Sequence, residues 1–425
     1  MHEHVTPYDR FAWSDLEIEE CLAGGAQPQE LRAHFGAAEY RALAALARRA
    51  RAVRPADPEL RVLVVPGIMG SQLGLERARP LPHDIVWLDP IDIAHGRLAA
   101  LTVPDAAPVV SLGVMLFSYL RLKLYLRAHG FAVEFHDYDW RLPVAESGRA
   151  LAARLQGLRP ARVALVAHSM GGLVSRAALM HAHTTHVQRL VLLGTPNSGS
   201  FAAVQALRGS YAVVRKVARI AGAATAESLA TDVFSSFPSL YELLPRTPCA
   251  ASCDLFDARA WPASGPKPRA ALLQAASDAQ RLLAPADARC SAIAGVGVET
   301  VTAVRRRRDE FVYTLTRHGD GTVPTCSAAL AGARTFYARV AHSELTRDAR
   351  VAAAVVDLLR RGTTRRLPDR ARSASRACTD ISDAQLRHTH ALKVDWAALT
   401  PQARRLFLQN LNEPPHLQLR VPRSR

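Results

Sequence analysis

Residues 162–176 read Arg-Val-Ala-Leu-Val-Ala-His-Ser-Met-Gly-Gly-Leu-Val-Ser-Arg, and this stretch decides the expected fold of the chain. The apolar run Val163–Val166 predicts a buried strand, and the apolar periodicity after Ser169 predicts a helix that begins at once. A turn this tight strains the backbone of the serine, so small residues are needed two positions before and after it. Ala167 and Gly171 supply them. The pattern therefore predicts a nucleophile elbow, in which the strand lifts the serine hydroxyl above the sheet and a helix N-terminus lies beside it.

A serine hydroxyl is a weak nucleophile unless a histidine takes its proton and a carboxylate orients that histidine. After such an elbow, the acid and then the histidine are expected on loops that follow later strands. The alternating stretch Phe311–Thr316 predicts a strand that ends shortly before the glycine-flanked Asp320, which is the candidate acid. Thr335–Val340 predicts the last core strand, and His342 follows it, just before the helical stretch Arg347–Leu359. His342 is therefore the candidate base.

These two candidates have plainer alternatives. An Asp-Gly pair such as Asp320-Gly321 often does no more than cap a turn. His318 competes with His342 as the base, but it lies only two residues from Asp320 on the same expected loop. The order of Ser169, acid and His342 along the chain favours the catalytic interpretation. The remaining histidines show no metal-ligand spacing, so we expect neither a metal nor a cofactor.

Ester cleavage also needs hydrogen-bond donors for a developing oxyanion. The N–H of Met170, directly after the serine, is one expected donor, and a loop after an early strand supplies the second. Leu60–Val65 predicts that strand, and the following Gly67, Ile68 and Gly70 predict a loop whose backbone can approach a substrate closely. The Ile68 N–H is thus the second candidate donor. A phosphate-binding loop is the alternative, but no Gly-Lys-Ser or Gly-Lys-Thr ends the segment.

Five motifs occur along the chain in a characteristic order. They are Val64–Leu73 (VVPGIMGSQL), Tyr138–Arg141 (YDWR), Ala167–Gly172 (AHSMGG), Pro238–Pro245 (PSLYELLP) and Gly319–Pro324 (GDGTVP). Together they resemble the lecithin:cholesterol acyltransferase family of α/β-hydrolases, which also contains phospholipases, over residues 60–360.

The resemblance implies an α/β-hydrolase fold with a mostly parallel central sheet and helices on both of its faces. It implies that Ser169 is the nucleophile, Asp320 the acid and His342 the base, with Ile68 and Met170 as oxyanion donors. The glycines that shape the elbow and the loop are Gly67, Gly70, Gly171 and Gly172. The implied reaction is hydrolysis of a carboxylic ester, of a lipid or phospholipid above all. Acyl transfer to a lipid alcohol is the alternative.

The chain departs from the family in two places. The interval between Asp320 and His342 is shorter than in animal members, and residues 74–110 lack the cysteines that close a lid there in secreted members. The fold and the catalytic residues are therefore expected to transfer, whereas the substrate and the acyl acceptor are not.

Strand and helix patterns alternate between residues 60 and 360, as expected for a parallel sheet covered by helices. We expect helices over Ser111–His129 and Gly148–Leu158, and a helical cap insertion over about residues 201–289 that includes Phe201–Ile220. The candidate acyl-chain contacts are Trp87, Phe234, Phe237 and Tyr241. Packing of these aromatic side chains into the core is the alternative role.

Two further regions flank this domain. Residues 1–59 form an expected N-terminal helical extension, residues 361–379 a linker, and residues 380–425 a C-terminal appendage that is helical over Asp380–Asn412. The appendage offers these apolar residues for burial: Leu386, Leu392, Trp396, Leu399, Leu406, Phe407 and Leu411. It is expected to dock on the hydrolase domain, and a protein partner is the alternative. A hydrolase fold that serves only as an interaction module is the third functional hypothesis.

The net charge of +16 does not predict nucleic-acid binding. Only four of the 54 basic residues are lysines, and the excess of Arg and Ala is typical of GC-rich bacterial coding sequences. The basic residues are dispersed rather than interleaved with aromatic residues on one face. Peripheral contact with an anionic membrane surface is the more plausible use of this charge.

Targeting signals are not evident in the sequence. Met1–Trp13 lacks the apolar segment of a signal peptide, and no apolar run reaches the ~20 residues of a transmembrane helix. The six cysteines show no framework spacing and are expected to be reduced. We therefore expect a cytoplasmic protein, with export by a route that needs no signal peptide as the alternative.

Overall fold

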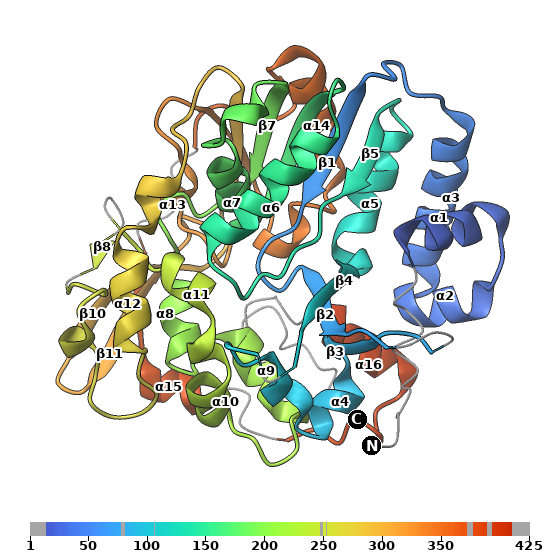
Figure 1. The fold of residues 1–425 in the computed structure, drawn as a ribbon. Coiled ribbons are helices and arrows are strands. Elements are labelled where there is room, and N and C mark those ends of the chain that lie inside the picture. The colour runs from blue at the N-terminus through green and yellow to red at the C-terminus, as the bar shows by residue number, and fades with distance from the viewer. Residues whose placement is uncertain are drawn as a thin grey trace.

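The computed structural model describes residues 14–77, 81–105, 107–246, 250–251, 253–371, 377–388 and 393–409 (Figure 1). Its centre is a six-stranded sheet in the order β12-β9-β7-β6-β1-β5, and every pair of neighbouring strands is parallel. The strands are β1 (Leu60–Val65), β5 (Ala132–Phe135), β6 (Arg162–His168), β7 (Val187–Leu193), β9 (Cys290–Gly295) and β12 (Arg334–Ala338). The predicted mostly parallel central sheet is thus confirmed.

Helices cover both faces of this sheet, because alternate side chains of each strand point to opposite faces. In β1, Leu63 and Val65 belong to the apolar core that includes α6 and α7, whereas Val62 and Val64 belong to the core with α5 and α14. The helices are α5 (Leu116–Arg127), α6 (Val144–Gly157), α7 (Met170–Ala178) and α14 (Ala349–Arg361). Both faces of the sheet are therefore buried, which explains the unbroken apolar run in β6.

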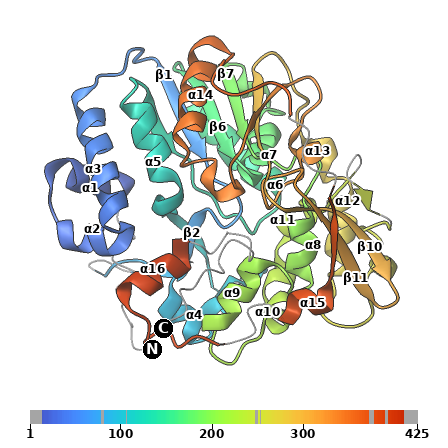
Figure 2. The same ribbon diagram turned by 180° about the vertical axis from the view of Figure 1, so that it is seen from behind.

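The N-terminal extension consists of α1 (Asp15–Gly24), α2 (Pro28–Phe35) and α3 (Ala37–Ala52), and it packs beside α5 (Figures 1 and 2). Ser14 and Glu17 form a capping box that begins α1. On α5, the ammonium group of the buried Lys123 pairs with the carboxylates of Asp15 and Glu19. These ion pairs attach the extension to the hydrolase core.

Two smaller sheets and the cap helices lie below the six-stranded sheet in the view of Figure 1. One sheet has the order β3-β2-β4, with β2 (Ser71–Leu75), β3 (Asp84–Trp87) and β4 (Val110–Val114). The other has the order β13-β11-β10-β8, with β8 (Ala250–Ala251), β10 (Thr300–Arg307), β11 (Glu310–Thr316) and β13 (Thr379–Ser382). The cap helices are α8 (Phe201–Leu207), α9 (Ala212–Ile220), α10 (Ala226–Asp232), α11 (Pro238–Glu242) and α12 (Ala270–Ser277).

Two expected helices differ in the structure. The first part of the helix expected over Ser111–His129 is the strand β4, because its alternating residues pair with the edge of β2. The helix expected over Phe201–Ile220 is broken into α8 and α9 at Gly209, whose φ of 68° is incompatible with a right-handed helix.

The C-terminal segment also begins differently from the expected helix. Residues 379–382 form β13, which pairs antiparallel with β11, and two helices follow: α15 (Asp383–His388) and α16 (Pro401–Gln409). Arg208, directly after α8, forms an ion pair with Asp383 in which both side chains are fully buried. Trp396 is buried as well, and α16 contacts α2. Leu392 and Leu411 lie outside the described residues.

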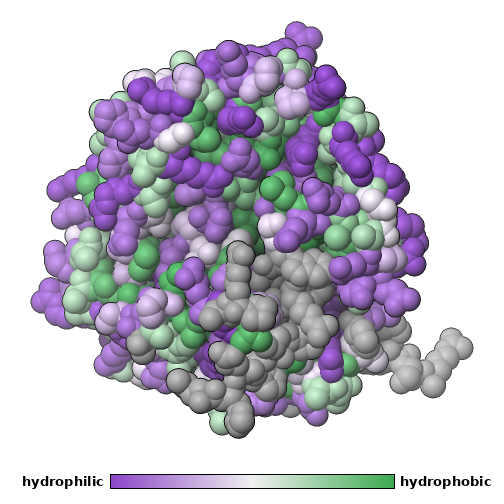
Figure 3. Space-filling model, turned by 45° about the vertical axis from the view of Figure 1, so that its right-hand side comes forward, coloured by the Kyte–Doolittle hydropathy of each residue, from purple (hydrophilic) through white to green (hydrophobic). Residues whose placement is uncertain are grey.

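Three features together identify the fold. They are a parallel sheet with helices on both faces, an elbow after its central strand β6, and cap insertions beyond the strand ends. The chain has an α/β-hydrolase fold. On the face in Figure 3, apart from the grey atoms, polar residues are intermixed with apolar ones. Among the described residues, no helix combines the length and the apolar character that a membrane span requires.

Candidate active site

The predicted elbow is formed where β6 meets α7. Ser169 connects the two elements with φ 53° and ψ −128°, a strained conformation for a residue with a side chain. The helix α7 begins at the next residue, Met170. The N-terminal end of a helix, with its free N–H groups, therefore adjoins the serine hydroxyl.

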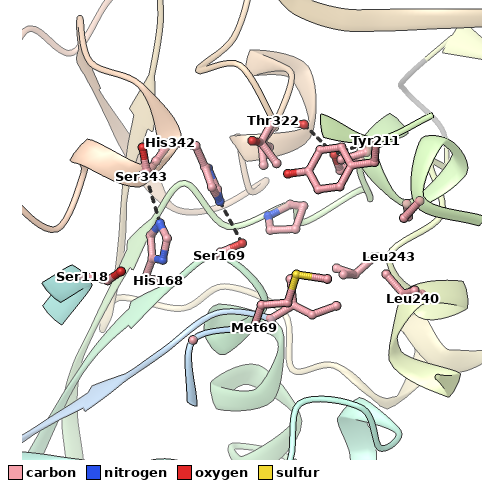
Figure 4. Close-up of a pocket in the computed structure, with 18 of the residues that line it drawn as sticks. Met69, Ser118, His168, Ser169, Tyr211, Leu240, Leu243, Thr322, His342 and Ser343 are labelled. Atoms are coloured by element: carbon pink, nitrogen blue, oxygen red, sulfur yellow. Dashed lines mark hydrogen bonds between the residues drawn. The ribbon is translucent and has the colours of Figure 1, made fainter. Parts of the chain in front are cut away.

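The structure brings Ser169, His342 and Asp320 together from three separate loops (Figure 4). The Oγ atom of Ser169 lies 2.9 Å from Nε2 of His342, and Nδ1 of the same ring lies 2.8 Å from Oδ2 of Asp320. The Nδ1–H of the neutral ring therefore donates to the carboxylate, while Nε2 accepts from the serine hydroxyl. His318, the competing histidine, is exposed to solvent.

The carboxylate of Asp320 is held in place by the main chain. Its Oδ1 atom accepts hydrogen bonds from the N–H groups of Thr322 and Val323, at 3.0 and 2.7 Å. The main-chain N–H of His342 also donates to the carbonyl of Asp320, at 2.8 Å. The side chain of Asp320 is only 1% exposed. The acid thus has little freedom to turn away from the histidine.

The loop after β1 lies directly against the serine. A Cβ atom added to Gly67 would lie 2.7 Å from Cβ of Ser169, and one added to Gly70 would lie 2.8 Å from the Tyr119 hydroxyl. Added Cβ atoms at Gly171 and Gly172 would collide with Pro66 and Thr195. Glycine is therefore required at these positions for close packing.

The two candidate oxyanion donors lie beside the serine. Ile68 lines the cavity beside Ser169, and Met170 is the first residue of α7. Within the part of the chain that the structure describes, the N–H groups of Ile68 and Met170 have no hydrogen-bond partner. Both groups are thus available to a substrate oxygen.

A buried hydrogen-bonded chain connects this loop to the histidine. The Tyr119 hydroxyl accepts from the Gly67 N–H at 2.9 Å and lies 3.0 Å from Nδ1 of His168. Nε2 of His168 lies 3.1 Å from the carbonyl oxygen of His342. Burial, together with the nearby His342, holds the pKa of His168 well below its ordinary value, so the ring is neutral. Tyr119 therefore donates to Nδ1, and the Nε2–H of His168 donates to the carbonyl.

A cavity of about 90 Å³ adjoins the serine. Its wall on the cap side is largely apolar and comes from α8, from α11 and from the C-cap of α11, through residues such as Ala203, Ala206, Leu240 and Leu243. Ser169 is 7% exposed, and the side chain of His342 is 11% exposed. Ser169 and His342 are thus largely shielded from solvent.

The four aromatic residues expected to contact an acyl chain do not line this cavity. Trp87, Phe234, Phe237 and Tyr241 are all buried in the core. Trp87 donates to the carbonyl of Met69, and its ring packs edge-on against Trp140. The Tyr241 hydroxyl donates to the carbonyl of Ser235. The expected contacts between these four side chains and an acyl chain are therefore not found in this cavity. The four side chains pack inside the protein, and the smaller residues Leu240 and Leu243 face the cavity.

Several residues of the site are not predictable from the sequence motifs. Tyr119 lies on α5, 49 positions before His168, and nothing in its neighbourhood marks it. Ser118, Tyr211 and Ser343 line the cavity but belong to no motif. The position of His168, directly before the nucleophile, is the one signal that could have been used.

One protein-family model matches part of the chain. Residues 152–233, which include Ser169, match a family described as "PGAP1-like alpha/beta domain". The resemblance to the lecithin:cholesterol acyltransferase family stays a prediction. No curated protein matches the chain.

Two solved structures are similar to this chain at low sequence identity. One is that of a Tle4–Tli4 complex, with 15% identity and a TM-score of 0.44, covering 70% of this chain and 97% of that chain. The other is the lipase BlEst2 of Bacillus licheniformis in its mature form, with 16% identity, a TM-score of 0.38, and coverage of 73% and 96%.

Proposed function

We propose that this protein is a serine hydrolase that cleaves carboxylic esters through an acyl-enzyme on Ser169. The observation that carries the proposal is the hydrogen-bonded series from Ser169 through His342 to Asp320, with distances of 2.9 and 2.8 Å. These distances lie within the reach needed for proton transfer between a nucleophile and its base.

In the proposed reaction, Oγ of Ser169 forms a bond to the carbonyl carbon of the ester while its proton passes to Nε2 of His342. The carbonyl oxygen becomes an oxyanion, which accepts hydrogen bonds from the Ile68 and Met170 N–H groups. Asp320 stabilises the protonated ring through Nδ1–H. The bond from the carbonyl carbon to the alcohol oxygen then breaks, and the alcohol leaves with the proton of His342.

Deacylation reverses these steps with water as the nucleophile. Water gives a proton to Nε2 of His342 and attacks the acyl carbon, and the acid leaves while Ser169 regains its proton. An alcohol that reached the acyl-enzyme would give a new ester by the same steps. Hydrolysis and acyl transfer therefore share every residue named so far and differ only in the attacking group.

The apolar wall formed by α8 and α11 supports the proposal that the acyl group of the ester binds on this side of the cavity. The low exposure of Ser169 supports a substrate that enters after the cap moves. Both features fit an ester of a fatty acid.

The test is labelling of the purified protein with a fluorophosphonate, located by intact mass and peptide mapping. One adduct on Ser169, absent from Ser169→Ala and much slower in His342→Ala, is the expected result. Incubation with a labelled fatty-acid ester and a lipid alcohol then separates free acid from new ester. Failure of Ser169 to react, with and without detergent to open the cap, would reject the proposed enzyme and favour the interaction-module hypothesis.

A further inference from the structure

A second cavity lies at the edge of the central sheet opposite the candidate active site. Its volume is about 610 Å³, compared with about 90 Å³ for the cavity beside Ser169. Residues near the start of β1, β6 and β7 and at the C-terminal end of α14 line it. In Figure 1, β1 begins at the top of the view, whereas the cap helices lie at the bottom. Because β6 runs from Arg162 to the residue before Ser169, the two cavities lie at opposite ends of this strand, about 20 Å apart.

The charged residues that line this second cavity are mostly positive. Four are arginines, and among the described residues that line it one is acidic: Arg162, Arg189, Arg289, Arg360 and Asp57. A concave site in which one sign of charge predominates concentrates that potential between its walls. The second cavity therefore favours a negatively charged ligand.

Strand pairing brings three of these arginines together. Arg189 on β7 pairs with Ala164 on β6, and Arg162 lies two residues before Ala164. Arg289 directly precedes β9, and its carbonyl accepts a hydrogen bond from the N–H of Leu190 at 2.9 Å. Neighbouring strands are about 4.8 Å apart, so the main chain at Arg289 lies next to that at Arg189. The three arginines thus come from adjacent strands of one sheet.

The side chains of Arg162 and Arg189 point to the face of the sheet that α14 covers. Ala164 and Val191 belong to the apolar core with α5 and α14. Since residues two positions apart in a strand share a face, Arg162 and Arg189 lie on the same face as this core. The C-terminal end of α14 is therefore the part of that helix that adjoins these arginines.

The other two ends of the cavity's charge balance are also on this face. A Cβ atom added to Gly362, the residue after α14, would lie 3.4 Å from Nη2 of Arg189. Arg360, two residues before Gly362, is exposed, and its Nη2 donates to the carbonyl of His129 at 2.6 Å. Nη1 of the half-buried Arg189 donates to the carbonyl of Gln188 at 3.2 Å. Within the described ranges, neither Arg189 nor Arg360 forms an ion pair.

The protein neutralises only part of this charge. Two of the four guanidinium groups pair with carboxylates, Arg162 with Asp57 at 2.5 Å and Arg289 with Asp287 at 2.6 Å. Both of these arginines keep exposed surface, at 43% and 30% of their side chains. The C-terminal dipole of α14 offsets about half a charge more. An excess of positive charge remains at the mouth of the cavity.

We propose that the second cavity binds a phosphate group, carried by a soluble phosphate ester or by a lipid headgroup. A phosphate dianion supplies the negative charge that Arg189 and Arg360 lack, and planar guanidinium groups match phosphate oxygens in bidentate geometry. The volume leaves room for the organic part of the ligand beside Thr185 and Gln188, which also line the cavity. This site is independent of the proposed function, since none of its residues belongs to the candidate active site.

The test is isothermal titration calorimetry of the full chain with glycerol 3-phosphate at low ionic strength, with glycerol as the uncharged control. We expect one site with a Kd of about 1 mM or tighter, and no binding of glycerol. Arg189→Gln and Arg360→Gln should each weaken binding by about tenfold or more, because each removes a charged hydrogen-bond donor. Arg281→Gln removes the same charge from an exposed residue outside the cavity and should change Kd by less than about twofold.

A second assay identifies the source of the phosphate. It measures co-sedimentation with phosphatidylcholine vesicles, with and without phosphatidic acid. Binding that needs phosphatidic acid and is weakened in Arg360→Gln but not in Arg281→Gln supports the site with a lipid headgroup as its ligand. Binding of glycerol 3-phosphate alone supports the site with a soluble ester as its ligand.

Arg360 is exposed, so its variant tests the site even if Arg189→Gln does not fold. Absence of binding in both assays, or equal weakening in Arg281→Gln and Arg360→Gln, would overturn the proposed site. Fluorophosphonate labelling of Ser169 should be unchanged in all three arginine variants. Failure of this site and failure of the proposed hydrolase are therefore read from different measurements.

Discussion

Nε2 of His168 lies 3.1 Å from the main-chain carbonyl oxygen of His342, so the residue before the proposed nucleophile, Ser169, holds the proposed base. Through the Tyr119 hydroxyl, the same ring is connected to the Gly67 N–H of the loop that carries Ile68. One hydrogen-bonded chain thus fixes the positions of His342 and of the loop that carries Ile68, a proposed oxyanion donor. None of its members needs to touch the substrate.

Tyr119→Phe should break this chain without removing a reacting group. The Gly67 N–H loses its acceptor and His168 loses its donor, so the loop and His342 are less well placed relative to Ser169. We expect kcat to fall by about 10–100-fold, since displacements near 1 Å have effects of this size, while KM changes little. The fluorophosphonate labelling rate should fall in parallel. Tyr313→Phe, which removes a buried hydroxyl group that donates to Asp383, should destabilise the protein but leave kcat unchanged.

Asp320→Asn tests the acid of the site. The amide retains the shape of the carboxylate and an acceptor for the Thr322 and Val323 N–H groups, but it cannot stabilise a protonated His342. We expect kcat for ester hydrolysis to fall by about 10⁴ with little change in the melting temperature. A fall of less than tenfold in a folded variant would mean that another group orients the base.

Gly67→Ala tests the close approach of the loop to the nucleophile. The added methyl group would lie 2.7 Å from Cβ and 3.3 Å from Oγ of Ser169, so either the loop or the serine must move. We expect kcat to fall by at least about 10², the effect of losing one oxyanion donor. Gly157→Ala is the matched control, because an added Cβ there meets nothing within 4 Å. Full activity in both variants would contradict the tight packing at Gly67.

The juxtaposition of the three candidate catalytic side chains was easier to predict than the cavity walls around them, for a physical reason. Ser169, Asp320 and His342 stand at strand ends with local signals: flanking small residues, flanking glycines and an adjacent helix. The roles of Phe234, Phe237 and Tyr241 could not be predicted in this way, because an aromatic residue in a cap insertion is equally suited to a core or to a cavity wall. Their burial, with Phe237 packed edge-on against Trp140, decides between the two roles.

The C-terminal segment shows the same limit. The helical periodicity of residues 380–412 gave no sign that residues 379–382 pair with β11, because this pairing depends on an open sheet edge far away in the sequence. Tyr119 was missed for a similar reason, since its bond to His168 joins positions 49 residues apart. Contacts between segments that are distant in the sequence cannot be predicted from local sequence patterns.

Glu242→Gln tests a partly buried carboxyl group at the end of α11, next to the cavity-lining residue Leu243. Burial raises the pKa of Glu242 from 4.5 to about 7, although the Val144 N–H and Arg246 act in the opposite direction. The folded state therefore keeps this proton between pH 4.5 and 7 while the unfolded state loses it. The contribution of this group to stability is full below pH 4.5 and is lost as the pH rises through 7.

Glutamine cannot ionise, and its side-chain oxygen can still accept from the Val144 N–H. In urea unfolding, the variant should match the wild type near pH 4.5 and exceed it at pH 8, by at most about 3 kcal/mol. Both proteins contain the same other titratable groups, so the contributions of these groups cancel in the difference between the two free energies of unfolding. A difference that does not change with pH would show that Glu242 ionises normally.

Asp383→Asn and Asp380→Asn compare a buried and an exposed ion pair within one short segment. Asp383 pairs with Arg208 with no exposure of either side chain, and it also accepts from the Tyr313 hydroxyl at 2.7 Å. Asp380 pairs with Arg305 where the two side chains are 45% and 43% exposed. Loss of the buried partner should lower the free energy of unfolding by about 3–5 kcal/mol. Loss of the exposed partner should lower it by less than about 1 kcal/mol.

The buried pair also connects the C-terminal segment to the active site. Arg208 directly follows α8, and Ala203 and Ala206 on α8 line the cavity beside Ser169. When Asp383 no longer holds Arg208, α8 should be less fixed, and KM for an ester with a long acyl group should rise in Asp383→Asn but not in Asp380→Asn. Equal stability and equal KM in the two variants would mean that this segment lies on the cap without supporting it.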